Sequence, residues 1–232
     1  MKKNENLPQG VTQFLEHHPD IVQIIIDLID RNPELKAILT DLIRCYVAIT
    51  GCFDNGGKLF LCGNGGSFAD CLHISGEMLK SFRRNRNLTA EDRSKFQNLP
   101  DGQILADALE YGFPLIVLGL NHSLKSAIEN DIPVPYIGYA QELFSLGSKG
   151  DVLFGISTSG NAKNVVYAMT TAKAMGIKTI GLTGQVGGML AQMVDISIRV
   201  PASTTDLIQE LHQLVYHTLC AIIEARYFKE VK

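Results

Sequence analysis

The chain has 232 residues, of which 46% are hydrophobic and 19% are charged, a composition typical of a globular domain with a sizeable core. Its net charge of -3 and pI of about 6.1 argue against nucleic acid as a partner. No apolar run is long enough to span a membrane, and the N-terminus MKKNENLPQG lacks the apolar segment of a signal peptide. The five cysteines are scattered without a CxxC pair, which is typical of reduced thiols, so we expect a cytoplasmic protein with no membrane partner.

The first part of the chain predicts helices ahead of an α/β core. Residues 11–29 carry apolar side chains at helical spacing, after a loose tail at 1–10. Asn32 and Pro33 predict the N-cap and the first position of a second helix, which runs to about Cys52. The apolar faces of these leading helices suit either a subunit interface or packing on the chain's own sheet.

Residues 58–82, KLFLCGNGGSFADCLHISGEMLKSF, predict a strand, a glycine turn and a helix in succession. The glycines allow a ligand to approach the backbone closely, and the start of the helix offers unpaired N–H groups and a positive dipole end. His73 and Glu77 lie four residues apart and therefore share one helix face. Such a turn is also common in α/β proteins at large, and a His/Glu pair can simply be solvated or hydrogen-bonded. This stretch alone therefore does not establish a site.

The segment at 83–112 is long for a connection inside an α/β core, which is typical of a lid or a binding element. Arg83, Arg84 and Arg86 form a small basic cluster, which we interpret as a solvated face rather than a phosphate site. Residues 101–111 predict a short amphipathic helix.

Strands and helices alternate in the rest of the chain. This alternation predicts an α/β fold with a doubly wound five-stranded parallel sheet flanked by helices. Ligands of such sheets bind beyond the carboxyl ends of the strands. The remaining strands are predicted at residues 114–119, 151–156, 178–182 and 195–200, and helices in the segments 120–130, 139–146, 165–175, 189–193 and 205–228.

The loop after the third predicted strand combines several features of a phosphate site. Ser157, Thr158 and Ser159 supply three consecutive hydroxyls, and Gly160 and Asn161 lead into a helix. Hydroxyls and backbone N–H groups at a helix start suit a phosphate. Helix capping is the alternative, because Ser and Thr are good N-caps. Three hydroxyls exceed what a cap requires, so we favour phosphate binding.

The last predicted helix carries a polar stripe beside its apolar face. Gln209, Gln213 and His217 follow one another at intervals of four, and Asp206 lies three residues before the first of them. Such a stripe is often only the boundary with solvent. A stripe with His, Gln and Asp also occurs where a site lies at an interface.

These motifs together resemble the phosphoheptose isomerases, which are sugar isomerase (SIS) domain proteins. The motifs are GNGGS followed by HxxxE, ISTSGN, LTG, IRVP, and DxxQExH with a second histidine eight residues after the Gln. The resemblance spans nearly the whole chain. It implies an SIS-type fold at 56–232 and a homotetramer with sites between subunits. The insert at 83–112 is longer than this family predicts, and we assign the helical lead-in at 1–55 to an oligomer interface. It also implies an aldose–ketose isomerase that converts sedoheptulose 7-phosphate to D-glycero-D-manno-heptose 7-phosphate through an enediol.

The resemblance further implies roles for individual residues. Glu77 would be the general base, and His217 the general acid or a partner in proton transfer. A zinc ion would be held by His73, Glu77, Gln209 and His217, whose imidazole, carboxylate and amide donors suit that metal. The sugar phosphate would be bound by Asn64, Gly65, Gly66, Ser67, Asn130, Asp131, Ser157, Thr158, Ser159, Asn161, Asp206 and Gln209.

Two alternatives compete with this interpretation. A relative of these isomerases binds the bacterial replication initiator as a non-catalytic, tetrameric assembly factor and lacks the histidine that matches His217. The presence of His217 favours an enzyme. The second alternative is an SIS protein for a different sugar phosphate, which the insert at 83–112 keeps open.

Overall fold

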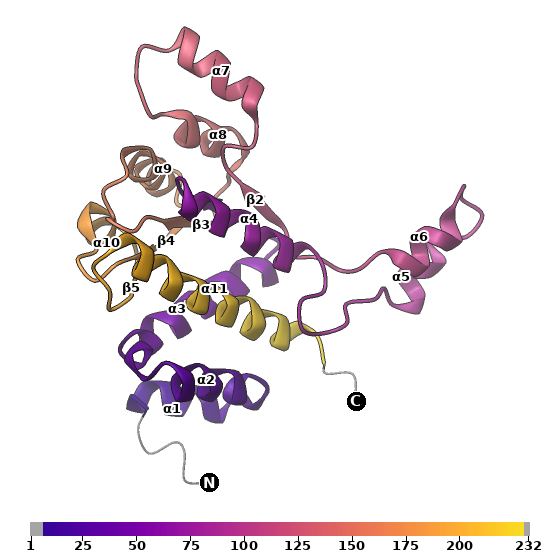
Figure 1. The fold of residues 1–232 in the computed structure, drawn as a ribbon. Coiled ribbons are helices and arrows are strands. Elements are labelled where there is room, and N and C mark those ends of the chain that lie inside the picture. The colour runs from indigo at the N-terminus through magenta and orange to yellow at the C-terminus, as the bar shows by residue number, and fades with distance from the viewer. Residues whose placement is uncertain (1–6, 230–232) are drawn as a thin grey trace.

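The computed structural model describes residues 7–229, so most of the tail expected at 1–10 lies outside the described residues. Five strands form one parallel sheet in the order β2-β1-β3-β4-β5 (Figure 1). The predicted doubly wound sheet is therefore confirmed, with strand ends within about three residues of those expected. The strands are β1 Leu59–Cys62, β2 Leu115–Val117, β3 Val152–Ile156, β4 Lys178–Thr183 and β5 Ile196–Arg199.

Helices cover both faces of the sheet, because alternate strand residues point to opposite sides. Leu59 and Leu61 of β1 belong to the core beneath α1–α4 and α11, whereas Phe60 and Cys62 belong to a second core beneath α8–α10. No helix within residues 7–229 has both the length and the apolar composition that crossing a membrane requires. The helices are α1 Gln9–Glu16, α2 Pro19–Arg31, η1 Pro33–Ile38, α3 Leu39–Asp54, α4 Gly66–Leu79, α5 Ala90–Ser94, α6 Gly102–Ala108, α7 His122–Asp131, α8 Gly138–Leu146, α9 Lys163–Ala174, α10 Gly188–Met193 and α11 Thr205–Tyr227.

The strand order reverses at β1, which has β2 on one side and β3 on the other. Cys62 at the end of β1 pairs with Gly155, one residue before the end of β3. The loops that follow these two strands therefore start side by side at one edge of the sheet. Open α/β sheets bind their ligands at such a reversal.

The helical lead-in differs from its prediction in two places. The single helix predicted at 11–29 is wrong, because Pro19 begins a new helix and divides the segment into α1 and α2. Asn32 does not cap the next helix, since its side chain donates to the carbonyl of Leu28 at 3.3 Å and a 3₁₀ helix, η1, precedes α3. The apolar faces of α1–α3 pack on the sheet and on α11 within one core. Their place in an oligomer interface remains a prediction.

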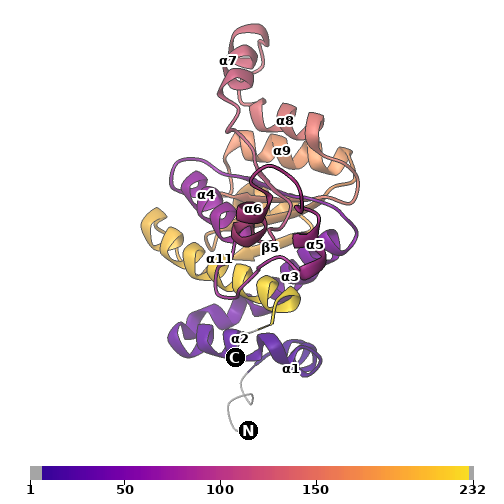
Figure 2. The same ribbon diagram turned by 90° about the vertical axis from the view of Figure 1, so that its right-hand side faces the viewer.

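The insert at 83–112 forms an arm that carries α5 and α6 and reaches out from the body of the molecule (Figures 1 and 2). An antiparallel bridge between Asn87 and Glu110 closes the base of this arm. Helix α6 confirms the short helix predicted near the end of the insert, whereas α5 has no counterpart in the prediction. The solvated basic cluster is wrong for Arg86, which is fully buried and ion-paired with Glu224.

Candidate active site

Two parallel helices, α4 and α11, carry the acid and base candidates. Contacting residues on the two helices are separated by nearly the same number of positions in the sequence, so the helices run in the same direction. Gln209 lies against Gly66, and the hydroxyl of Tyr216 bonds Nδ1 of His73 at 2.9 Å. A Cβ atom on Gly66 would lie 2.2 Å from Nε2 of Gln209, so the absence of a side chain at Gly66 lets the end of the Gln209 side chain lie against the helix backbone. This packing brings the HxxxE motif of α4 beside the second histidine of α11.

Three of the predicted site residues form one cluster. Nε2 of His217 lies 3.1 Å from Oε1 of Glu77, and Nε2 of His73 lies 3.3 Å from the same oxygen. The two Nε2 atoms are 3.5 Å apart. The structure thus joins the predicted base to the predicted acid across two helices that are far apart in the sequence.

The surroundings of the cluster set its protonation. Burial raises the pKa of Glu77, whose side chain is only 9% exposed. Burial is also the main cause that lowers the pKa of His217, which favours a neutral imidazole near pH 7. Within residues 7–229, Oε2 of Glu77 is buried without a hydrogen-bond partner. Oε1, by contrast, faces both imidazoles, so it is the oxygen of this carboxylate that lies in the cluster.

The cluster also fits a metal ion by the chemistry of its donors. One ligand atom from each of His73, Glu77 and His217 lies within 4.8 Å of the others. Imidazole nitrogens and a carboxylate oxygen are ordinary zinc ligands. Tyr216 occupies Nδ1 of His73 and so leaves Nε2 directed toward the other two residues. Gln209 is placed apart from these three, because Gly66, against which it lies, is about 10 Å before His73 along α4.

The two predicted phosphate loops lie next to each other at the carboxyl edge of the sheet. Ser67 and Ser157 are buried, whereas Ser159 is exposed and Thr158 is intermediate. Gly160 has a φ of 67°, and a Cβ there would lie 1.9 Å from the carbonyl oxygen of Gly187. Only glycine suits this position, and it lets the ISTSGN loop pack closely against the loop after β4.

Asparagine side chains fix these loops. Asn161 donates to the carbonyl of Ser159 at 3.1 Å and accepts from the backbone N–H of Met189 at 3.0 Å. Its side chain is therefore engaged in the loop structure. Asn64 and Asn164 exchange two side-chain hydrogen bonds of 2.8 Å, which tie the loop after β1 to the first turn of α9.

A cavity of about 780 Å³ opens beside the loop after β1. It lies between the start of α4, the end of β2, and helices α7 and α8, and its wall includes Asn64 and Gly65. Asn130 and Asp131 are exposed at the end of α7, bond each other at 2.8 Å, and do not line this cavity. Asp206 is exposed in the first turn of α11, where the Thr204 hydroxyl and nearby backbone N–H groups lower its pKa.

Sequence reasoning missed Asn164, Tyr216 and the buried pair of Arg86 and Glu224. Asn164 lies three residues after the ISTSGN motif, so its place in the first turn of a helix was a usable signal. Tyr216 directly precedes His217, but its direction depends on the packing of two helices. Arg86 and Glu224 are 138 residues apart, and no local pattern links them.

Comparisons with known proteins agree with this architecture. The model of the SIS domain family matches residues 136–184. The chain is 36% identical to a phosphoheptose isomerase of Glaesserella parasuis serovar 5, over 91% of this chain and 95% of that protein. It is 37% identical to a phosphoheptose isomerase of a Roseiflexus species, over 91% and 93%. The solved structure of a phosphoheptose isomerase from Neisseria gonorrhoeae superposes with a TM-score of 0.66 at 28% identity, over 92% and 97% of the two chains.

Proposed function

The chain belongs to the phosphoheptose isomerase family, and we propose that it interconverts sedoheptulose 7-phosphate and D-glycero-D-manno-heptose 7-phosphate in heptose biosynthesis. The observation that carries this proposal is the contact of 3.1 Å between the buried carboxylate of Glu77 and the imidazole of His217. A protein that only binds a partner has no need of such a pair. The non-catalytic alternative is therefore not favoured.

The substrate phosphate binds at the loops after β1 and β3, where Ser67, Ser157, Thr158 and Ser159 supply hydroxyls. Glu77 follows Ser67 by ten residues on α4, which places their Cα atoms about 15 Å apart. The side chain of Glu77 leans back toward the start of the helix and shortens this span. An extended seven-carbon sugar reaches roughly 10 Å from its phosphorus to C1, at the advance per bond of an extended chain. The agreement between these two lengths supports a long sugar phosphate as the substrate.

Glu77 acts as the base of the isomerisation. Its carboxylate takes a proton from C1 of the open-chain ketose, and the C1–C2 enediol forms as the carbonyl electrons move to the C2 oxygen. Glu77 then returns the proton to C2. The O1 hydroxyl gives its proton to the imidazole of His217, which replaces the proton that this imidazole gave to the C2 oxygen, and C1 becomes the aldehyde carbon. The neutral imidazole of His217 serves these oxygens as a hydrogen-bond donor and a partner in proton transfer. The phosphate loops hold the reacting carbons near Glu77, which is a gain from positioning.

We propose zinc as the metal of this site, held by His73, Glu77 and His217, with Gln209 joining only if its side chain leaves Gly66. A bound zinc ion supplies Lewis-acid polarisation of the substrate oxygen. Elemental analysis of protein purified without chelator should give about one zinc per chain, and His73→Ala should lose most of it. Gln209→Ala should keep it. Metal-free protein, or equal loss in both variants, would contradict this ligand set.

We also propose that the enzyme is a cytoplasmic homotetramer. Leu72 and Leu79 on α4 are 42% and 51% exposed, and such apolar residues beside the catalytic cluster support a subunit contact there. Light scattering during size-exclusion chromatography tests the number of chains. A monomer at micromolar concentration would contradict the tetramer.

The proposed activity is tested by incubating the protein with sedoheptulose 7-phosphate and following aldoheptose 7-phosphate by NMR. Fructose 6-phosphate, which is one carbon shorter, is the matched control substrate. Conversion of the heptulose at a kcat/KM at least tenfold above that of the hexulose is the expected result. Conversion of neither substrate by folded protein, in the presence of added zinc, would refute the proposal.

A further inference from the structure

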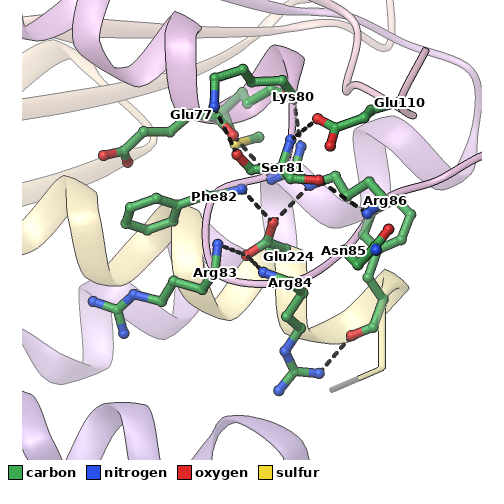
Figure 3. A network of polar contacts seen from close by, with 12 residues as sticks. Glu77, Lys80, Ser81, Phe82, Arg83, Arg84, Asn85, Arg86, Glu110 and Glu224 are labelled. Atoms are coloured by element: carbon green, nitrogen blue, oxygen red, sulfur yellow. Dashed lines mark hydrogen bonds and ion pairs between the residues drawn. The ribbon is translucent and has the colours of Figure 1, made fainter. Parts of the chain in front are cut away.

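The root of the insert places a buried arginine directly behind the catalytic helix. Arg86 is 0% exposed, and its guanidinium makes three different hydrogen bonds (Figure 3). Nη2 donates to the carbonyl of Glu77 at 3.0 Å, Nη1 donates to the carbonyl of Met78 at 2.8 Å, and Nε donates to Oε1 of Glu224 at 2.8 Å. The rings of Phe113 and Phe228 lie 4.8 and 5.4 Å from the guanidinium carbon. Arg86 therefore has its place fixed from several sides.

The two carbonyls lie in the last turn of α4, where backbone oxygens lack partners within the helix. Arg86 thus caps the end of the helix that carries the base. The carboxylate of Glu77 points away from this network while the carbonyl of the same residue is bonded to Arg86 (Figure 3). The backbone of Glu77 is consequently held by a residue that does not touch the site.

Glu224 anchors the same network to the other catalytic helix. It is 0% exposed and lies on α11, seven residues after His217. Besides Arg86, its carboxylate accepts backbone N–H groups of Phe82, Arg83 and Arg84 at 2.8 to 3.1 Å. The ion pair therefore joins the end of α4 to α11, two turns from the imidazole of His217.

We propose that Arg86 and Glu224 are a positioning pair for the isomerisation. The pair fixes α4 along the axis of α11, and this fixes the distance between the carboxylate of Glu77 and the imidazole of His217. A charged pair is suited to this task, because the planar guanidinium serves two carbonyls and one carboxylate in a rigid geometry. This inference rests on the proposed function.

A purely stabilising role is the competing explanation, and the double variant Arg86→Met/Glu224→Leu separates the two. Each single change leaves a buried charge without its partner, whereas the double change removes both charges, so the double change should lower the thermal midpoint by less than the two single changes added together. For the double variant we expect kcat to fall about 100-fold with KM within twofold of wild type. Recovery of both the midpoint and kcat would overturn the proposal.

Arg86→Lys covers the case in which the double variant does not fold. An ammonium keeps the charge opposite Glu224 but lacks the planar fork for the two carbonyls, so kcat should fall about tenfold with KM unchanged. Wild-type kcat in this variant would also overturn the proposal. The matched control is Arg226→Met/Asp54→Leu, which removes an ion pair of 2.6 Å between α11 and α3 and should leave kcat unchanged.

The failure of the proposed function is a separate outcome. If the wild-type chain converts no sugar phosphate, the positioning role is tested by the dissociation constant for Zn²⁺ without any sugar. This test applies because the same pair positions His73, Glu77 and His217. Arg86→Lys should then weaken zinc binding about tenfold. Equal zinc affinity in wild type and variant would overturn the positioning role.

Discussion

At the carboxyl edge of the sheet, some side chains hold the loops in place, and others remain available to bind a ligand. Asn161 is bonded within its own loop and to the start of α10, so its removal should disturb the loop itself. Ser159 is exposed, and among the described residues its Oγ accepts a hydrogen bond only from the backbone N–H of Asn161, at 3.2 Å. Its hydroxyl hydrogen is therefore free to bond a phosphate oxygen. Of the two residues, Ser159 is the cleaner probe of substrate binding.

Ser159→Ala is expected to raise KM about tenfold with little change in stability, because a hydrogen bond to a charged group contributes roughly 1.5 to 3 kcal/mol. Steady-state kinetics and thermal unfolding of the same preparation check both parts. Ser94→Ala, on the distant helix α5, is the matched control and should leave KM unchanged. An unchanged KM in Ser159→Ala would move the phosphate to another place.

His212 is a second residue whose surroundings give a measurable consequence. It is fully buried on α11, and within the described residues neither ring nitrogen has a hydrogen-bond partner. Burial lowers its pKa from 6.5 to about 4. The unfolded chain therefore binds a proton below pH 6.5 that the folded chain accepts only near pH 4, so the stability that this residue contributes is present above pH 6.5 and is lost as the pH falls toward 4.

Replacing His212 by Leu should remove this part of the acid sensitivity. Between pH 7 and pH 4, the free energy of unfolding should fall by on the order of 3 kcal/mol less than in wild type, at about 1.36 kcal/mol per pKa unit. Urea unfolding at both pH values measures the difference. Gln213→Leu, at an exposed and uncharged position of the same helix, should keep the wild-type pH dependence. Parallel pH profiles for wild type and His212→Leu would contradict the argument.

At the scale of elements, the insert consists of a root and an arm with separate consequences. The root, which includes Arg86, packs against the ends of α4 and α11. The arm beyond the Asn87–Glu110 bridge projects away from the body, and its helix α6 exposes Ile104 and Leu105 by 67% and 42% (Figure 1). The role as a lid or binding element that the length of this segment suggests stays a prediction.

Replacing residues 88–109 by Asn-Gly should leave a folded and active enzyme. Asn87 and Glu110 already pair across the base of the arm, and a two-residue turn of this type closes an antiparallel pair. We expect kcat and KM within about threefold of wild type, and a thermal midpoint within a few degrees. A tenfold increase in KM would instead identify the arm as a lid over a site.

Secondary structure was predictable where the local pattern decides it. The strands are short apolar runs bounded by glycine and polar residues, and the sheet buries them on both faces as that pattern requires. Pro19 was a local signal as well, and it was overlooked within an otherwise helical pattern. The ends of helices were harder to predict from the sequence. The 3₁₀ helix after Asn32, for example, packs against α2 and α3, and these contacts are not visible in the local sequence pattern.

The candidate site was predictable as a set of motifs but not as a geometry. The motifs named His73, Glu77 and His217, and the packing of α4 along α11 brought them together. The same packing placed Gln209 at Gly66, away from these three, which helical spacing on α11 alone does not reveal. Arg86 shows this most clearly. It lies in a charged segment, and its burial depends on Glu224, which is 138 residues away in the sequence.

The whole molecule combines one parallel sheet, two helices on one of its faces that carry the proposed base and acid, and an arm that leaves the body. The loops proposed to bind phosphate lie at the reversal of the strand order, and the cluster of His73, Glu77 and His217 lies further along α4 and α11. A substrate that spans both regions must be long and carry an anionic end. This arrangement supports isomerisation of a heptose phosphate by the base Glu77, which is the central claim for the molecule.

The most direct test follows sedoheptulose 7-phosphate in D₂O by NMR with wild type and Glu77→Gln. The wild type should form aldoheptose 7-phosphate with deuterium at C2, because the proton that Glu77 takes from C1 exchanges with solvent before it returns. Glu77→Gln keeps the size of the side chain and should lose activity about 10³-fold with an unchanged circular dichroism spectrum. Near-normal turnover in Glu77→Gln would contradict the account.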